Sequence, residues 1–395
     1  MAKILIVEEA LRDQNGHWYE YNHAIVTEAR AAGHDVTLLT HAEIEPALQE
    51  KLGAKAFFPV TSWDGVYHHP SSWRRYLGIL KHNRLIKKLL TDHFKEQKEA
   101  YDVVLVPTVV LFHWIAWRRL VSKGARKWFH KVVLTTRNNA GEYDPETKSY
   151  QFGASAKVLA KVLRGFRKPV EAGIVQMASD SRKLAEQYEA LCGLPFQTYP
   201  HPRPTDHLKI PDQRSELIFS ALGPPRYEKG SDLILLAIQQ ILEEDPQFPA
   251  HFVLQWTAQV FDLAEREVKI PDALRDHPKV EILTEPLSSE EYERRIETSA
   301  VLLLPYRRAQ YHARLSGIAI EAFQSGVPCI CISDTWVEDC MDEIGFGIAI
   351  DHESVDDLIV AIRKMAQSPP ITPDRIKAAR QAYSPKAFLN LLLKR

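Results

Sequence analysis

Short apolar runs alternate with longer amphipathic segments along the whole chain. The runs are rich in Val, Ile and Leu, a composition typical of strands that are buried on both faces of a parallel sheet. The segments between them place apolar residues at helical spacing, and Gly33 closes the helix expected after the first run. This alternation predicts βαβ units and doubly wound sheets, and therefore an α/β fold class. The strands predicted in the first half are 2–9, 35–41, 102–108, 131–137 and 172–179.

A proline-rich stretch at 199–213 lacks apolar periodicity and is predicted to be a linker between two domains. The alternation restarts after it. We therefore predict a first domain over 1–203 and a second over 204–380, followed by an amphipathic helix over 381–395. The second domain is predicted to hold strands at 216–223, 251–256, 279–284, 300–306, 328–333 and 347–351, and helices at 231–244, 288–299, 316–326 and 354–367.

Size and composition agree with two domains, because 395 residues exceed one ordinary core. No apolar run approaches the ~20 residues that cross a bilayer, and the start of the chain lacks the features of a signal peptide. The four cysteines form no CxxC pair, so neither a cysteine zinc site nor a disulfide framework is indicated. A reducing, cytoplasmic location is expected.

Charge is unevenly distributed. Residues 1–200 carry 28 Lys and Arg against 21 Asp and Glu, a balance of +7, and the remainder carries 22 against 30, a balance of −8. Such an asymmetry favours an anionic partner for the first half. Chance asymmetry between two solvated surfaces explains it equally well.

The first loop with chemical content follows the strand at 216–223. It contains Gly223, Arg226 and Lys229, and a helix begins near Ser231. The amino end of a helix presents free N–H groups and a positive dipole end, and two cations beside it make a phosphate site. The alternative is a solvated turn whose basic side chains point to water.

The second loop follows the strand at 300–306 and carries Arg314. Ser316 can cap the next helix, and Gly317 allows a ligand to approach the backbone closely. Glu321 lies just over one turn into this helix, where it can accept hydrogen bonds from a vicinal diol such as that of a ribose. Alternatively, Glu321 pairs with Arg314 or another cation, or lies at the surface.

Together the two loops predict a site for a nucleotide diphosphate. No metal is required, because no Asp-x-Asp pair occurs in the chain. Arg226 and Lys229 would neutralise a leaving diphosphate in place of a metal, with the N–H groups of Ser316 and Gly317 assisting.

These residues resemble the GT-B glycosyltransferases, in particular the retaining enzymes of family four. The loop from Gly223 to Gly230 resembles the Gly-Arg-x-x-x-x-Lys-Gly loop of that family, and Glu321 matches the second Glu of its Glu-x7-Glu motif. The loop with Thr284 and Leu287 stands where the family usually holds the nucleobase.

The resemblance implies a GT-B architecture, in which two Rossmann-like domains face a cleft and the final helix crosses back to the first domain. It implies a metal-independent hexosyltransferase that uses a UDP- or GDP-linked sugar, needs no separate cofactor and retains the anomeric configuration.

The chain departs from the family pattern at three positions. Ala313 stands where the motif has its first Glu, Pro224 where the phosphate loop has Arg, and Arg137 where a His is frequent. These departures bear on the sugar end of the donor.

In the first domain, the loop of Asn15, Gly16 and His17 and the residue Arg137 are expected to face the cleft. His113 is a further candidate. A lone histidine beside Phe112 and Trp114 is more often structural.

Two basic amphipathic segments, 73–95 and 156–168, suggest contact with anionic lipid and a lipid-linked acceptor. Ordinary packing with a solvated basic face is the alternative, and no nucleic-acid recognition motif is present. We therefore expect transfer to a cell-envelope glycan or lipid in polysaccharide biosynthesis, at the inner face of the membrane. A sugar-nucleotide epimerase, or a nucleotide-sugar-binding protein without turnover, remains the alternative, the latter because of Ala313.

Overall fold

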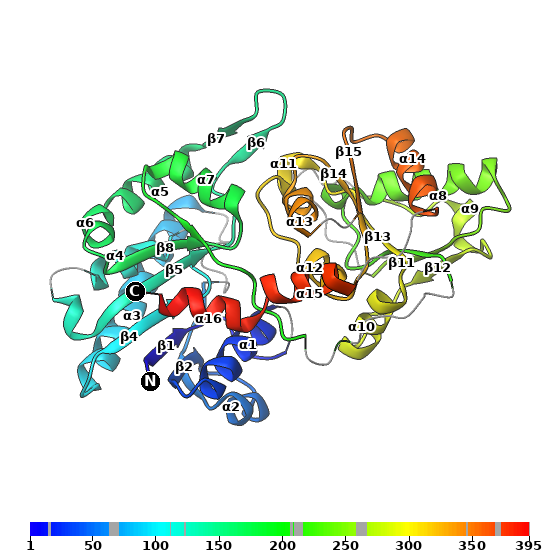
Figure 1. Cartoon of the computed structure of the whole chain (residues 1–395). Coiled ribbons are helices and arrows are strands. Elements are labelled where there is room, and N and C mark those ends of the chain that lie inside the picture. The colour runs from blue at the N-terminus through cyan, green and yellow to red at the C-terminus, as the bar shows by residue number, and fades with distance from the viewer. Residues whose placement is uncertain are drawn as a thin grey trace. The chain divides into compact units, whose positions relative to one another are not determined.

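The structure is a computed structural model that describes residues 1–14, 17–62, 71–110, 112–121, 124–205, 208, 216–257, 267–344, 347–367 and 373–394. The chain forms two compact units (Figure 1). The first contains residues 1–142, 150–204 and 383–395, and the second contains residues 143–149 and 205–382. Of the predicted linker 199–213, residues 206–207 and 209–213 lie outside the described part.

The first unit contains a seven-stranded parallel sheet in the order β3-β2-β1-β4-β5-β8-β9. Its central strands are buried runs of Val, Ile and Leu, as the apolar pattern predicted. The edge strands β3 and β9 were not predicted, because they are short and carry few branched residues. The strands are β1 (Lys3–Val7), β2 (Asp35–His41), β3 (Ala54–Phe58), β4 (Tyr101–Val106), β5 (Phe129–Thr136), β8 (Val175–Ser179) and β9 (Gln197–Thr198). A small separate pair, β6 (Glu142–Asp144) and β7 (Ser149–Gln151), includes residues of both units.

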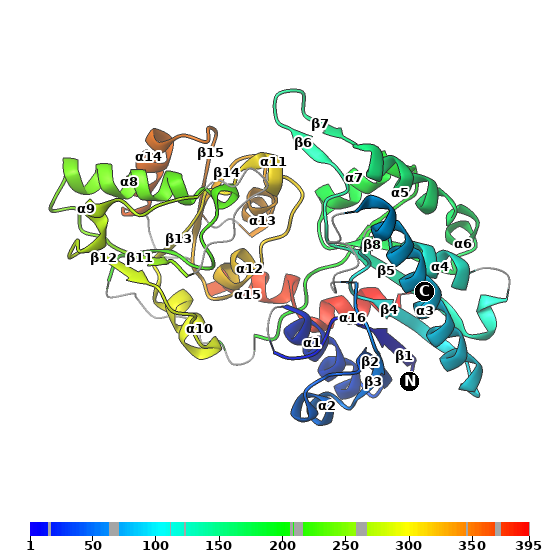
Figure 2. The same ribbon diagram turned by 180° about the vertical axis from the view of Figure 1, so that it is seen from behind.

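Helices cover both faces of this sheet. The last helix, α16, lies along α1 on one face (Figures 1 and 2), where buried Phe388 contacts the rings of Tyr21 and Tyr199. On the opposite face α3 packs through Phe94 against Phe129 of β5. The helices are α1 (His17–Ala31), α2 (Pro46–Leu52), α3 (Ser72–Glu96), α4 (Trp114–Leu120), α5 (Ala154–Arg164), α6 (Arg167–Glu171), α7 (Arg182–Cys192) and α16 (Pro385–Leu393), with the short 3-10 helix η1 (Ala125–Lys127).

Two helix predictions in this unit need correction. His17 was assigned to a loop, but it is the first residue of α1. The pattern predicts one helix over 156–168, but the structure has two, because α5 ends at Arg164, directly before Gly165, and α6 begins at Arg167. A side chain at Gly165 would collide with the guanidinium of Arg118, so the break accommodates a close approach from α4.

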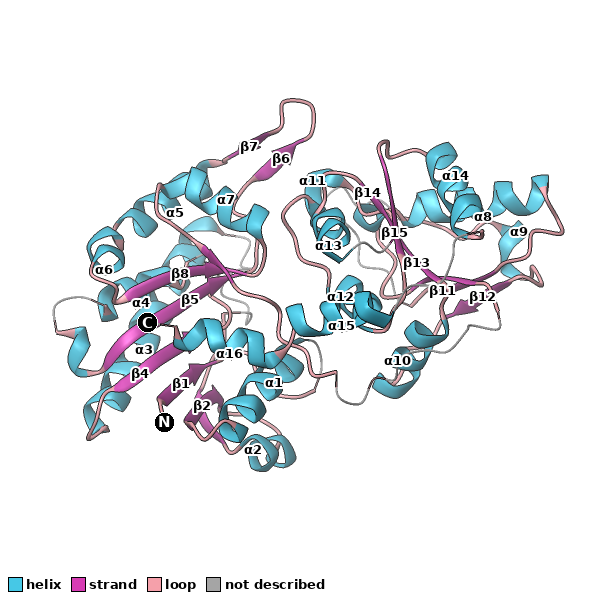
Figure 3. Ribbon diagram, in the orientation of Figure 1, coloured by secondary structure: helices cyan, strands magenta, loops and turns pink. Residues whose placement is uncertain are grey.

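The second unit contains a six-stranded parallel sheet in the order β12-β11-β10-β13-β14-β15. All six strands lie within the predicted runs. Figure 3 shows them as one magenta layer between helices. The strands are β10 (Ile218–Ala221), β11 (His251–Gln255), β12 (Val280–Leu283), β13 (Val301–Leu304), β14 (Cys329–Ile332) and β15 (Gly347–Ile350).

The main core of this unit lies where α8 and α14 pack their apolar faces on the sheet. The helices at 231–244, 288–299, 316–326 and 354–367 form close to their predicted limits, because serine caps and glycine ends mark them. Ser288, Ser316 and Ser354 accept the capping hydrogen bond at three of these helices. The helices are α8 (Ser231–Glu244), α9 (Asp272–Arg275), α10 (Ser289–Thr298), α11 (Arg308–Tyr311), α12 (Gly317–Gln324), α13 (Trp336–Ile344), α14 (Val355–Met365) and α15 (Pro373–Ala382), with the short η2 (Tyr227–Lys229).

Both sheets follow the same winding rule. In each, the first strand of the unit is hydrogen-bonded on one side to the second and on the other side to the fourth, so the direction of winding reverses there. Ligands of open α/β sheets bind beyond the carboxyl ends of the strands at such a switch point. The loops after β10 and β13 are therefore the expected site in the second unit, and those after β1 and β4 in the first.

All four cysteines are buried free thiols. Among the described residues, no helix combines the length and the apolar character needed to cross a membrane.

Candidate functional site

The loop after β10 is shaped by two glycines with left-handed backbone angles. Gly223 has φ of 90°, and its N–H donates to Oε1 of Gln255 at 2.6 Å. Gly230 has φ of 68° and directly precedes α8. A Cβ at Gly230 would lie 2.2 Å from the carbonyl oxygen of Pro305, which follows β13. This close approach brings the two switch-point loops together, and only glycine permits it.

Three cations converge on these loops. The ammonium of Lys229 reaches back to Gly223, where an added Cβ would lie 3.2 Å from Nζ. Burial, together with the positive charges of Arg226 and Arg314, lowers the pKa of Lys229 to about 8, although Glu228 acts to raise it. Among the described residues, no carboxylate forms an ion pair with Lys229. A bound anion would offset the repulsion between these cations and raise the pKa of Lys229.

The remaining arginines of the second loop have structural partners. Arg307 forms ion pairs with Asp232 at 2.6 Å and Glu353 at 3.1 Å. The Arg308 guanidinium donates to the backbone carbonyl of Ser333 at 2.7 Å. Both side chains therefore hold the loop in place, whereas Arg314 is exposed and contributes its charge to the cation cluster, the term used below for Arg226, Lys229 and Arg314.

The helix after this loop begins as expected. Ser316 accepts a hydrogen bond from the N–H of Ala319 at 3.4 Å. A Cβ at Gly317 would meet nothing within 4 Å, so the space beside this helix start is open to a ligand. Glu321 is half-buried further along α12. Ala313 is 2% exposed, so a glutamate at this position would not fit without rearrangement.

Thr284 and Leu287 follow β12, which is one of the two edge strands of the sheet. Two strand spacings of about 4.8 Å each separate β12 from β10, so these residues lie roughly 10 Å to the side of the cation cluster's loop. Thr284 is exposed and Leu287 is half-buried, and Ser288 caps α10 directly after them.

The structure describes only some of the site residues that were predicted in the first unit. Asn15 and Gly16 lie outside the described residues, as does the side chain of His17. Arg137 directly follows β5, and its guanidinium lies 3.9 Å from the ring centre of Tyr21. His113 is buried next to Glu9, with 3.3 Å between its Nδ1 and the carboxylate.

Sequence reasoning missed two acidic residues here, Glu8 and Glu9, which follow β1 at the switch point of the first unit. Burial raises the pKa of Glu8 to about 7, although the N–H of Ala10 and the charge of Arg137 lower it. The signal was available, since two glutamates close the first apolar run.

Comparisons with known proteins support the architecture. No family model matches the chain, and no curated protein matches it in sequence. Solved structures do match. A trehalose-6-phosphate protein from E. coli bound with UDP-2-fluoroglucose aligns at a TM-score of 0.63 and 10% identity over 99% of each chain. Sucrose-phosphate synthase from Thermosynechococcus elongatus aligns at 0.62 and 10% identity, covering 98% of this chain and 97% of that one.

Anabaena HepE in complex with UDP aligns at a TM-score of 0.63 and 12% identity over 98% of each chain. These likenesses extend over nearly the full length of every protein, and they define the class: this chain has the GT-B fold of glycosyltransferases, with two Rossmann-like domains.

The approach of Gly230 to Pro305 can be tested by substitution. Gly193 has almost the same backbone angle, φ of 69°, but nothing lies within 4 Å of an added Cβ. Gly193→Ala should therefore lower the free energy of unfolding by only about 1–2 kcal/mol, which is the cost of holding an alanine in the left-handed backbone region. Gly230→Ala should cost about 1–3 kcal/mol more, because its methyl group also overlaps the backbone. Amide hydrogen exchange in the unit that carries each residue measures the loss in free energy of unfolding. Equal losses for the two variants would contradict the close approach of Gly230 to Pro305.

Proposed function

We propose that this protein is a glycosyltransferase that uses a UDP- or GDP-linked sugar and releases the nucleoside diphosphate. The observation that carries the proposal is the cation cluster at the switch point of the second unit. Its three positive charges come from two loops, and Lys229 has a lowered pKa there because of burial and because Arg226 and Arg314 repel its proton. This is the electrostatic environment that a diphosphate requires.

The cluster would act on the leaving group. During transfer, the bond between the anomeric carbon and the β-phosphate oxygen breaks, and the acceptor hydroxyl oxygen bonds to that carbon. The hydroxyl proton passes to the departing diphosphate, which gains negative charge. Lys229, fully protonated once an anion is bound, and Arg226 stabilise that charge without a conformational rearrangement. Attack on the face that the diphosphate leaves gives retention, and the side chains supply positioning and charge.

The ribose is assigned to the loop and helix after β13, and the base to a third loop, which follows β12. Gly317 leaves open space where a ligand can reach the start of α12, and Glu321 lies one turn further on. We assign the ribose hydroxyls to the Glu321 carboxylate and the base to the loop with Thr284 and Leu287. Support comes from HepE, whose structures hold UDP and UDP-glucose on the same fold.

The acceptor is proposed to be a cell-envelope glycan or a lipid-linked saccharide at the cytoplasmic face of the membrane. At the start of α3 three large apolar side chains are exposed: Trp73 by 62%, Tyr76 by 61% and Leu77 by 53%. Arg74 and Arg75 are exposed between them. Aromatic and basic side chains on one short helical stretch suit the interface of an anionic membrane.

A turnover assay tests the proposed reaction. The protein is incubated with a panel of UDP- and GDP-hexoses, with and without a membrane extract as acceptor source, and nucleoside diphosphate release is measured. Release should occur with at least one donor, and Lys229→Ala should lower it about 10²–10³-fold, as expected for the loss of one charge-stabilising donor. Lys269→Ala, at a side chain that is 76% exposed, should leave it unchanged.

Two other outcomes would overturn transfer. A change in the sugar without diphosphate release indicates an epimerase. Tight binding of a nucleotide sugar with no reaction under any condition indicates a binding protein. Ala313, which stands where the family motif has a glutamate, would then explain the lack of turnover.

Membrane contact is tested by flotation with vesicles of phosphatidylcholine, with or without phosphatidylserine. The wild-type protein should float with the anionic vesicles, and the double variant Trp73→Ser with Tyr76→Ser should float several-fold less. The matched control replaces Val360, an exposed apolar residue on α14 of the second unit, by Ser. Equal absence of binding to both vesicle types would contradict membrane contact.

A further inference from the structure

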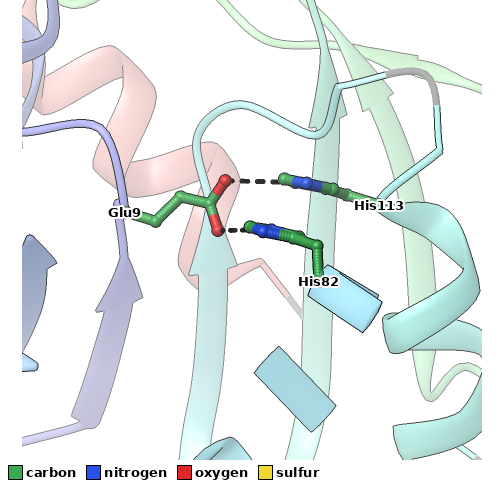
Figure 4. Close-up of side chains that lie close together, drawn as sticks. All are labelled: Glu9, His82 and His113. Carbon is green, nitrogen blue, oxygen red and sulfur yellow. Dashed lines mark ion pairs between the residues drawn. The ribbon is translucent and has the colours of Figure 1, made fainter. Parts of the chain in front are cut away.

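Three side chains from separate elements of the first unit meet beyond the carboxyl end of β1. Glu9 follows β1, His82 lies on α3, and His113 directly precedes α4. Figure 4 shows both imidazole rings pointing at the Glu9 carboxylate, one opposite each oxygen. The ring centres are 4.4 Å apart and the rings are nearly parallel, at 5°. One ligand atom from each residue can be chosen so that all three lie within 4.8 Å of one another.

The surrounding backbone holds these residues in place. The N–H of Ser62 donates to Oε1 of Glu9 at 2.8 Å and fixes the carboxylate. Asn83, next to His82, accepts a hydrogen bond from the N–H of Ala116 at 2.8 Å and so joins α3 to α4. This preorganisation is what a metal site needs from its supporting shell.

The contacts are longer than ordinary charge-assisted hydrogen bonds. Nε2 of His82 lies 3.3 Å from Oε2 of Glu9, and Nδ1 of His113 lies 3.3 Å from Oε1. A hydrogen bond between imidazole and carboxylate would bring these atoms to about 2.7–2.9 Å. Ligand atoms around a tetrahedral Zn²⁺, with bonds of about 2.0–2.1 Å, stand roughly 3.3 Å apart. A tilt of the two rings toward each other would bring Nε2 of His82 and Nδ1 of His113 to that spacing as well.

His82 provides an independent indication. It is 3% exposed, and neither of its ring nitrogens makes a hydrogen bond among the described residues. Leaving both nitrogens of a buried imidazole without a hydrogen bond is costly. A cation between Nε2 and the carboxylate would satisfy one of them.

We propose that Glu9, His82 and His113 form a binding site for a divalent transition metal of the zinc class, with the fourth position open. Two imidazoles and one carboxylate are a ligand set that Zn²⁺ accepts. The ion would clamp α3 and the start of α4 to the loop after β1, and so fix the switch point of the first unit. The proposal does not depend on sugar transfer, because the cation cluster lies in the other unit.

The test uses the full-length protein, purified without a metal-affinity step and stripped with a chelator. Titration with Co²⁺ should give the intense visible absorption of a tetrahedral ion, saturating at one equivalent, and Zn²⁺ should abolish it. Zn²⁺ should also raise the melting temperature of the stripped protein, because it binds only the folded state. Glu9→Gln and His82→Asn should each weaken Co²⁺ binding at least about 10-fold.

The matched control is His93→Asn, since His93 is also a buried histidine on α3 but pairs with the hydroxyl of Tyr101 at 3.0 Å. This variant should bind Co²⁺ as the wild type does. Absence of tetrahedral Co²⁺ absorption in the wild-type protein would overturn the proposal, and the triad would then be a contact of histidine and glutamate alone. Undiminished binding in both ligand variants would equally overturn it. The wild-type spectrum decides the matter even where a variant fails to fold.

Discussion

The repulsion between Arg226, Lys229 and Arg314 is the constraint on which the proposed diphosphate site depends. Burial and the positive charges of Arg226 and Arg314 lower the pKa of Lys229, while Glu228, which lies 3.5 Å from the Arg226 guanidinium, opposes them. The fold maintains the arrangement because Gly230 allows the loop after β10 to reach Pro305, and because Arg307 ties the loop after β13 to Asp232 and Glu353. The fold therefore holds the cations of the proposed site together before any ligand arrives.

The same winding pattern carries different chemistry in the two units. In the second unit, the switch point between β10 and β13 gathers cations. In the first unit, the switch point between β1 and β4 gathers Glu8, Glu9 and His113. Ligand preference is thus set by the residues placed on the loops, while the sheets supply only the position. The first unit offers carboxylates and imidazole, which suit hydroxyl groups, protons and cations more than phosphate.

Most of the fold was predictable because its local signals agree with one another. The helix α8 spans the predicted residues 231–244, since an apolar face and a glycine at its start point to the same limits. The positions of the loops after β10 and β13 could likewise be predicted from the order of strand, loop and helix alone. The start of α1 was predicted wrongly at its first turn, because His17 and the aromatic residues after it carry no capping signal.

The roles of individual loop side chains were not predictable from local sequence. Arg307, Arg308 and Arg314 look alike in the chain, and only distant partners such as Asp232 and Ser333 separate the structural ones from the one in the cation cluster. His82 was missed for the same reason, because it lies far from Glu9 in sequence. The cysteine spacing excluded only a cysteine-based zinc site, and a site of two histidines and a glutamate has no such short motif.

The central claim is that the two loops of the second unit hold one nucleoside diphosphate, with its phosphates at the cation cluster and its ribose at Glu321. The most direct test is calorimetric titration of UDP, GDP and their 2′-deoxy forms into the wild-type protein and the Glu321→Ala variant. For the nucleotide that binds, the wild type should prefer the ribose form by about 1–3 kcal/mol, the value of one buried charged hydrogen bond, and Glu321→Ala should lose that preference while still binding the diphosphate. Equal preference in both proteins would show that the ribose lies elsewhere and would contradict the account.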